Sequence, residues 1–402
     1  MKTVGIIVEY NPLHSGHLFL MEEVRRTLGA DTRIICVMSG DFVQRGDFAL
    51  VRRQARARAA VESGADLVLE LPLPWAVSSA DGFADGGVQT LLATGLVQHL
   101  AFGSECGDIA ALQAVARTLL QPEFSAALQE PLRSGISFAA ARQQAIAQLL
   151  DEPAARLLAQ PNNILAVEYC KSLLRHNASA LPLTVQRTGT PHDAGILTDG
   201  HPSASAIRSL LSQGQRDNAL ARMAPAMARA YLEEESLGRA PVMLEGAQRA
   251  MLAQLRRMTP EEFDTLDAGG EGLSRRLYEA SRSAASLEEL WAAAKTKRYA
   301  HARLRRMTLW AYLGLRADSC PPSPAYLRPL AANAVGCGML SEMRTAASLP
   351  ILTKPADVRQ LSSQAQALFA LESRAADLYT LAYPNLSAAE GGVLWRSSPA
   401  IL

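Results

Sequence analysis

Two histidines three residues apart are the most informative feature of the sequence. His14 and His17 flank Gly16 shortly after an apolar run at Val4–Val8, where a strand would pass into a helix N-terminus. The amides of a helix start suit phosphates, and imidazole N–H groups can follow negative charge as it develops on phosphate oxygens. The glycine spacing matches neither a Walker A loop nor a GxGxxG fingerprint. The pattern predicts chemistry at a phosphate, and the alternative is that the histidines only cap the helix.

A second phosphate-binding pattern lies further along the chain. Ser203 or Ser205 is a natural N-cap for a helix expected over Ala206–Leu211, and Arg208 can add a charge-assisted contact. On its own, an ordinary capped helix explains this pattern. Together with the histidines, it predicts two helix starts that flank one phosphate path.

Three weaker candidates occur between these motifs. Gly103 is expected at the end of a strand, where a missing side chain lets a base or ribose approach closely. Asn162 and Asn163 precede a helix expected over Ile164–Leu174, so one of them should cap it and the other face the ligand. Arg187 is expected at the end of a further strand beside the crevice. Turn or cap roles are the default for each of them.

Two basic segments point to a polyanionic partner. The first runs from Lys295 to Arg306 with six Lys or Arg residues and no acid, and one helix is expected there with Ala300 and Leu304 on its apolar face. The second contains the residues Arg45, Arg52, Arg53, Arg56 and Arg58. A solvated helix face is the usual explanation of such runs, and Arg45 could instead contact pyrophosphate. Two separate segments nevertheless predict a nucleic acid that crosses both halves of the protein.

Composition limits the class of protein. The 402 residues are 49% hydrophobic and 20% charged, which excludes disordered, collagen-like and disulfide-scaffold chains. The balance of 40 Lys and Arg against 39 Asp and Glu gives a charge of +1, which argues against indiscriminate coating of nucleic acid. The five cysteines form no close pair, so no metal knuckle and a reducing compartment are expected. With neither a leader nor an apolar span apparent, we expect no membrane contact and a cytoplasmic location.

Alternating strands and helices must position these residues. Short apolar runs bounded by turn residues, with helical stretches between them, predict βαβ units around a parallel sheet whose carboxyl edge binds ligands. The second half has mainly helical spacing. The expected strands are Val4–Val8, Ile34–Met38, Leu67–Leu71, Leu100–Gly103 and Leu183–Gln186. We therefore expect an α/β domain over residues 1–215, with a helical insertion at about 107–180, and a mostly helical domain over 216–402.

The combined motifs resemble those of the bacterial tRNA(Met) cytidine acetate ligases, within the wider HxGH nucleotidyltransferase superfamily. The likeness covers nearly the whole chain and is weakest after about residue 310. The segments that carry it are Val4–His17, Met38–Gly46, Glu70–Pro72, Phe102–Glu105, Pro161–Ile164 and Lys295–Tyr299. The resemblance implies a Rossmann-like parallel-sheet nucleotidyltransferase domain and a helical tRNA-binding domain. It also implies that ATP and acetate form acetyl-adenylate, which acetylates N4 of the wobble cytidine of elongator tRNA(Met).

The resemblance also implies roles for individual residues. His14 and His17 would be catalytic, stabilising charge at the α-phosphate as acetate attacks and pyrophosphate leaves. The implied ATP-binding residues, joined by Ser205 and Arg208 from the serine motif, are Ile7, Val8, Glu9, Tyr10, Asn11, Pro12, Leu13, His14, Ser15, Gly16, His17, Leu18, Phe19, Leu20, Gly103, Asn162, Asn163 and Arg187. The expected tRNA-binding residues are Lys295, Lys297, Arg298, Arg303, Arg305 and Arg306. Mg²⁺ is expected to arrive with ATP, and no metal-binding residue of the protein is predicted.

The sequence departs from the family pattern at two positions. Leu13 stands where phenylalanine is usual, which should be a packing change. Ser15 stands where asparagine is usual, which removes an amide donor. Two alternatives remain: a small-molecule adenylyltransferase of the same superfamily, and a non-catalytic RNA-binding protein with a retained nucleotide fold. The first leaves the helical half unexplained, and the second leaves the histidine and serine motifs unexplained.

Overall fold

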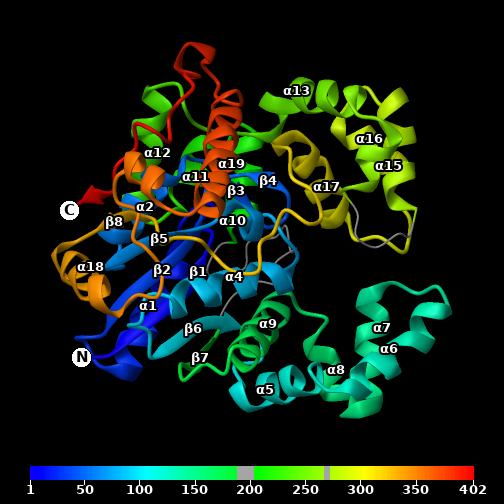
Figure 1. The fold of residues 1–402 in the computed structure, drawn as a ribbon, viewed down its shortest axis with the longest axis horizontal. Helices are drawn as coiled ribbons and strands as arrows, with labels where there is room; N and C mark the ends of the chain where they lie inside the picture. Colours follow the sequence, from blue (N-terminus) through cyan, green and yellow to red (C-terminus); the bar gives the residue numbers. More distant parts are fainter. Residues whose placement is uncertain (188–202, 267–271) are drawn as a thin grey trace.

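A seven-stranded sheet is the centre of the computed structural model, which describes residues 1–187, 203–266 and 272–402 (Figure 1). All neighbouring pairs from β7 to β5 are parallel, which confirms the expected α/β class. In spatial order the strands are β7 (Leu181–Gln186), β6 (His99–Ser104), β1 (Thr3–Val8), β2 (Arg33–Ser39), β5 (Leu67–Leu71), β8 (Pro329–Ala332) and β9 (Ala400–Ile401).

Helices cover both faces of this sheet because its strands are apolar on both sides. Val4 and Ile6 of β1 pack with α1, α2 and α12, whereas Ile7 packs on the other face with α4, α5, α9 and α18. Gly5 has no side chain because Leu91 of α4 fills that position. The bounds are α1 (Ser15–Leu28), α2 (Arg53–Glu62), α4 (Ala80–Leu92), α5 (Ile109–Thr118), α9 (Pro161–Arg175), α12 (Pro225–Ser236) and α18 (Ala334–Ala346).

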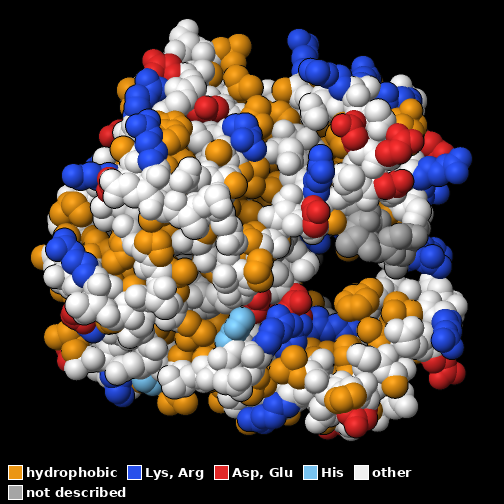
Figure 2. Space-filling view, viewed as in Figure 1, with side chains coloured by type: hydrophobic (Ala, Val, Ile, Leu, Met, Phe, Trp, Pro, Cys, Tyr) orange, Lys and Arg blue, Asp and Glu red, His pale blue; other side chains and the backbone are white. Residues whose placement is uncertain are grey.

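Most of the remaining helices form a bundle and an outlying group. The bundle shares one core and contains α13 (Leu244–Arg257), α14 (Pro260–Asp264), α15 (Leu273–Ser283), α16 (Leu287–Ala294), α17 (His301–Leu313) and α19 (Ser363–Thr380). The outlying group between β6 and β7 contains α6 (Pro122–Arg133), α7 (Phe138–Leu149) and α8 (Glu152–Leu157). The shorter elements are β3 (Phe42–Val43), β4 (Asp47–Phe48), α3 (Leu73–Ala76), α10 (Ala204–Ser212), α11 (Arg216–Leu220), η1 (Pro355–Gln360) and η2 (Leu386–Ala388). Figure 2 shows open space between α6–α7 and the α15–α17 helices, with Lys and Arg side chains along its lower edge.

The helical half also contributes to the sheet, which the sequence analysis missed. β8 pairs antiparallel with β5, and β9 pairs parallel with β8. Residues after position 216 therefore extend the sheet as well as forming the bundle. The domain boundary near residue 215 stays a prediction.

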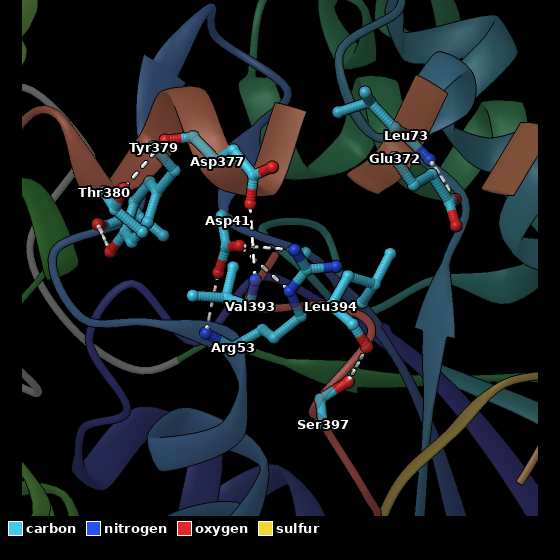
Figure 3. A network of polar contacts seen from close by, with 12 residues as sticks. Asp41, Arg53, Leu73, Glu372, Asp377, Tyr379, Thr380, Val393, Leu394 and Ser397 are labelled. Carbon is cyan, nitrogen blue, oxygen red and sulfur yellow. Dashed lines mark hydrogen bonds and ion pairs between the residues drawn. The ribbon is translucent and has the colours of Figure 1, made fainter. Parts of the chain in front are cut away.

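A buried ionic network joins the two halves, and Figure 3 shows its Arg53–Asp41 pair. The guanidinium of Arg53 on α2 lies 2.6 Å from both Asp41 and Glu70. Arg328, the residue before β8, pairs with Glu70 and lies 3.2 Å from Glu372 of α19. None of these five side chains is more than 7% exposed. Buried charges persist only when they are paired, so the network fixes the positions of α2, β8 and α19 relative to one another.

The second basic segment is largely a structural cluster, and its predicted role as a nucleic-acid surface is wrong for Arg53 and Arg56, which are buried. Arg53 belongs to the buried network, and Arg56 is fully buried with its guanidinium donating to backbone carbonyls. Arg52 and Arg58 lie 2.9 and 3.1 Å from two glutamates of α12, at positions 234 and 233. Arg45, by contrast, is exposed.

Candidate active site

His14 and His17 meet at the carboxyl end of β1, where they cap α1 together. The His14 backbone N–H donates to His17 Nδ1 at 3.2 Å, and the Gly16 N–H donates to His14 Nδ1 at 3.1 Å. Because each Nδ1 accepts a hydrogen bond, the neutral form of each ring carries its proton on Nε2. The cap role and the donor role are therefore compatible, since they use different nitrogens of each ring.

The two rings stack, and this arrangement opposes protonation. Their centroids lie 3.8 Å apart at an interplanar angle of 29°, and Tyr10 meets His17 edge-on at 5.0 Å. Burial, together with the charges of His14 and Arg187, holds the pKa of His17 well below 6.5. His17 is consequently a neutral donor at physiological pH. A neutral imidazole still carries one N–H group, and it can donate this hydrogen bond to a phosphate oxygen.

The loop before the histidines is held from three sides. Asn11 Oδ1 accepts from the Leu50 N–H at 2.7 Å, and the Asn11 carbonyl accepts from Arg208 Nη1 at 2.7 Å. The Leu13 carbonyl accepts from the Ala224 N–H at 3.0 Å, and Leu13 itself is fully buried. The buried Asn11 Nδ2 has no hydrogen-bond partner among the described residues, so a ligand could accept from it. The substitution of leucine for the usual phenylalanine is thus accommodated in the core.

The serine motif reaches the same loop. Ser203 caps α10 by accepting from the Ala206 N–H at 3.1 Å, as predicted, and the hydroxyls of Ser203 and Ser205 lie 3.1 Å apart. Arg208, one turn into α10, makes the contact to Asn11 described above. The structure therefore brings Arg208 into contact with the histidine loop.

The absence of a side chain at Gly103 leaves room for Arg187. A Cβ on Gly103 would lie 3.2 Å from Arg187 Cγ, so the glycine leaves room for this side chain against β6. Arg187 directly follows β7, and its positive charge contributes to lowering the pKa of His17. These residues from β6, β7 and α1 converge on one edge of the sheet.

The two asparagines do not cap their helix, contrary to the prediction. α9 begins at Pro161, so Asn162 and Asn163 lie inside its first turn. The Glu105 carboxylate takes the capping role, accepting from their backbone N–H groups at 3.1 and 2.7 Å. Asn163 is fully buried, and its Oδ1 accepts from the Glu105 and Cys106 amides. Asn162 is only partly buried, and its Nδ2 donates to Glu105 Oε1 at 2.7 Å.

Glu9, the residue after β1, is one of the implied ATP-binding residues, but the sequence does not predict what its carboxylate contacts. Its Oε1 accepts from the Gln44 N–H at 2.7 Å. Burial raises the pKa of Glu9, and Arg208 and Arg45 oppose the rise. The segment between β2 and α2 contains the β3–β4 hairpin, which contacts Glu9 through Gln44.

The segment from Lys295 to Arg306 is not one helix. α16 ends at Ala294 and α17 begins at His301, so Ala300 is an exposed N-cap rather than part of the buried stripe. Tyr299 lies in the bundle core at 4% exposure, and burying it takes the connection out of helical geometry. Lys295 Nζ donates to the Tyr299 carbonyl.

The six expected tRNA-binding residues fall into different environments. Lys297 and Arg298 are exposed. Arg305 lies 2.7 Å from Asp47 of β4 and lines a cavity of about 450 Å³ together with Arg208. Arg305 therefore lies beside Arg208, one of the expected ATP-binding residues, although it was expected on a tRNA-binding surface. The remaining pair, Arg303 and Arg306, faces a separate cavity.

Two features are absent from the described residues. Within residues 1–187, 203–266 and 272–402, no group of three or more His, Cys, Asp and Glu side chains is arranged to hold a metal ion. In the same part of the chain, no helix has the length and hydropathy needed to cross a membrane.

Comparisons with known proteins agree with this geometry. A family model described as HIGH Nucleotidyl Transferase matches residues 1–392. A protein of Acetivibrio thermocellus named tRNA(Met) cytidine acetate ligase is 37% identical, and the match covers 96% of each chain. A protein of Syntrophomonas wolfei with the same name is 34% identical over 99% of each chain.

Solved structures agree as well. The crystal structure of Thermotoga maritima TmcAL bound with alpha-thio ATP matches all of this chain with a TM-score of 0.93 and 32% identity. The apo form of the same protein gives a TM-score of 0.95. On this similarity in sequence and fold, the chain belongs to the tRNA(Met) cytidine acetate ligase family of HIGH nucleotidyl transferases.

Proposed function

We propose that this protein is an ATP-dependent ligase that forms acetyl-adenylate from acetate and ATP and then acetylates N4 of the wobble cytidine of elongator tRNA(Met). The observation that carries the proposal is the reciprocal capping of α1 by His14 and His17. It fixes the Nε2 proton on two neighbouring rings beside a helix N-terminus. Such preorganised donors stabilise charge that develops on a phosphoryl group.

In the first step, an acetate oxygen attacks the α-phosphorus of ATP and the bond from that phosphorus to the β-phosphate bridging oxygen breaks. Pyrophosphate leaves with the electron pair of that bond. His14 and His17 donate to the α-phosphate oxygens, and Arg208 and Ser205 hold the phosphates that depart. Arg187 adds charge beside His17. Mg²⁺ is proposed to arrive on the nucleotide phosphates, for which it commonly serves as the counter-ion.

In the second step, the cytidine N4 attacks the acetyl carbonyl carbon. The bond from that carbon to the adenylate oxygen breaks, AMP leaves with the electron pair, and N4 gives up one proton. The remaining residues of segment 7–20 and Gly103 would line the nucleotide. Of the two asparagines, Asn162 would contact it, because Asn162 is partly exposed whereas Asn163 is fully buried.

The tRNA is proposed to lie against the helical half, residues 216–402, and the opening beside it. Lys297 and Arg298 are exposed on the α16–α17 connection. A Cβ on Gly135, in the α6–α7 turn, would lie 3.4 Å from Arg298 Nη2, so this connection reaches across to the outlying helices. Basic side chains around an opening suit a folded RNA better than a flat surface would.

We propose that the protein acts in the cytoplasm. The test of the proposed function is acetylation by the purified protein. It is incubated with ATP, acetate and unmodified elongator tRNA(Met), and the nucleosides are analysed by mass spectrometry. Pyrophosphate release and N4-acetylcytidine at the wobble position are expected, and leaving out ATP, acetate or protein should abolish the product.

Other outcomes would identify other functions. Pyrophosphate release with a small acceptor and no modified tRNA would indicate a small-molecule adenylyltransferase. Retention of tRNA with no pyrophosphate release from folded protein would indicate a non-catalytic RNA-binding protein. Either result would contradict the proposal.

A further inference from the structure

A cavity of about 430 Å³ lies between the start of α4, α17 and the segment that follows α17. This volume lies within the range of small-ligand sites. Its polar walls include Ser78, Ser79 and three arginines, Arg303, Arg306 and Arg316. None of the residues assigned above to the histidine and serine motifs lines it.

One arginine of this cavity has no carboxylate beside it among the described residues. Asp81 is the one acidic residue of the described chain that lines the cavity, and its carboxylate is already engaged by Lys171 at 3.0 Å and Arg175 at 3.3 Å. Arg306 forms no ion pair with a carboxylate in the described part of the chain. Burial and the neighbouring Arg303 lower the pKa of Arg306 to about 10, which leaves it charged at neutral pH. An anion in the cavity could form a charge-assisted contact with Arg306.

The cavity is also lined by apolar side chains. Met307, Trp310 and Leu315 are among them. The indole Nε1 of Trp310 donates to the Val77 carbonyl at 2.8 Å, which fixes the orientation of the ring. An aromatic ring beside arginines is the pattern with which proteins hold single nucleotides, the ring stacking on a base and the arginines meeting phosphate.

One residue, Gln44, contacts both the cavity wall and the carboxyl end of β1, near which His14 and His17 lie. Gln44 donates through its backbone N–H to Glu9 at 2.7 Å and through its side chain to the Ser78 carbonyl at 3.4 Å. Gly46, two residues after Gln44, packs against the backbone of α17: a Cβ there would lie 2.5 Å from the Arg306 nitrogen. The β3–β4 hairpin thus lies between the end of β1 and the cavity.

We infer that this cavity receives a nucleotide of the tRNA that neighbours the acetylated cytidine, with Arg303 and Arg306 at its phosphate and Trp310 against its base. The inference rests on the proposed function. Enzymes that modify a base in an RNA loop splay neighbouring nucleotides apart, and each splayed base needs a surface to replace its lost stacking.

The test measures binding of a hairpin RNA with the sequence of the tRNA(Met) anticodon arm. Arg306→Gln should weaken binding about tenfold and lower the slope of log K against log salt by about 0.7, the value for one single-strand phosphate contact. The matched control is Arg275→Gln, which removes the same charge from an arginine that is 83% exposed on α15 and does not line the cavity. This control should bind like the wild type, and thermal unfolding checks that both variants are folded.

The base contact is tested by a double-mutant cycle. Hairpins that carry an abasic site on either side of the wobble cytidine are bound to the wild type and to Trp310→Leu. One abasic hairpin should bind the wild type about tenfold more weakly, and the same abasic change should cost Trp310→Leu little, because base and ring would act as a pair.

Three results would overturn the inference. The first is RNA affinity of Arg306→Gln equal to that of Arg275→Gln. The second is an additive cycle for Trp310. The third is tight binding of free cytidine or uridine monophosphate that Arg306→Gln abolishes while hairpin binding persists, which would assign the cavity to a free nucleotide. Failure of the proposed function is distinguishable, because it appears as absence of acetylcytidine with the wild-type protein.

Discussion

At the start of α1, His14 and His17 complete a helix and carry the proposed phosphate donors at once. Each ring uses Nδ1 for the cap, which leaves the proton on Nε2. A substitution that keeps the cap acceptor and removes the second nitrogen should therefore separate stability from catalysis.

His14→Asn is that substitution. Asparagine is a good N-cap residue, so the midpoint of urea unfolding should stay near that of the wild type. Acetate-dependent exchange of pyrophosphate into ATP should fall about 10²- to 10³-fold, since one preorganised donor is lost. His14→Ala should lose a similar rate and about 1 kcal/mol of stability in addition. A near-normal exchange rate for His14→Asn would show that the Nε2 proton is not used.

At the residue scale, the sequence predicts the types of the site residues and their spacing. It does not predict which of their side-chain atoms already form hydrogen bonds with other parts of the protein. The HxGH spacing and the Ser203 cap follow local backbone rules, and the structure has both caps. The commitment of Asn163 to the Glu105–Cys106 loop depends on a partner about 60 positions away in the chain. No local pattern contains that information.

At the scale of elements, the buried network makes α19 part of the catalytic half. Glu372 accepts from the Leu73 N–H at 3.1 Å and from the Tyr326 hydroxyl at 2.5 Å, besides its pairing with Arg328. Figure 3 shows Glu372 directed at Leu73, near the start of α3. One side chain therefore ties α19 both to α3 and to the segment that carries β8.

Glu372→Gln should cost about 3 kcal/mol of unfolding free energy, because it removes one partner of a buried charge set. The matched control is Glu342→Gln, which breaks a surface pair at 2.5 Å from Arg33 in which the carboxylate is 47% exposed. That change should cost less than about 1 kcal/mol. Urea unfolding of both variants gives the comparison, and equal losses would mean that the network contributes no more than a surface pair.

The strands of the parallel sheet were predictable because each is an apolar run between turn residues. β8 was not, since Pro-Leu-Ala-Ala has little strand propensity and becomes a strand only by pairing with β5. The break between α16 and α17 was missed for a similar reason: no Gly or Pro marks it, and it follows from the burial of Tyr299 in the bundle.

At the scale of the whole molecule, the net charge is close to zero, but the arginines differ in whether a carboxylate lies beside them in the fold. The run at positions 233–235 lies far from the Arg45–Arg58 segment in the chain, yet it neutralises Arg52 and Arg58 in the fold. Lys297 and Arg298 have no such acidic neighbour in the sequence and are exposed. Total charge therefore could not predict which basic segment remains available to RNA.

Salt dependence of tRNA binding should separate the two basic segments. The double change Lys297→Gln and Arg298→Gln should lower the slope of log K against log salt by about 1.4 to 1.8, or 0.7 to 0.9 per phosphate contact. The double change Arg52→Gln and Arg58→Gln should leave the slope as it is. Fluorescence anisotropy with labelled tRNA between about 50 and 200 mM salt measures both, and the reverse ranking would restore the Arg45–Arg58 segment as an RNA surface.

The pairing of β5 with β8 has a consequence for biosynthesis. Their partners are separated by roughly 260 residues, which a ribosome adds in about 13 to 50 s at common translation rates. For that time a nascent chain would present β5 as an open edge strand, the kind of edge that recruits other chains. β5 is fully apolar apart from Glu70, whose partner Arg328 is made last. During translation, the Glu70 carboxylate would have only Arg53 of its two arginine partners, and its charge would disfavour association of the edge with other chains.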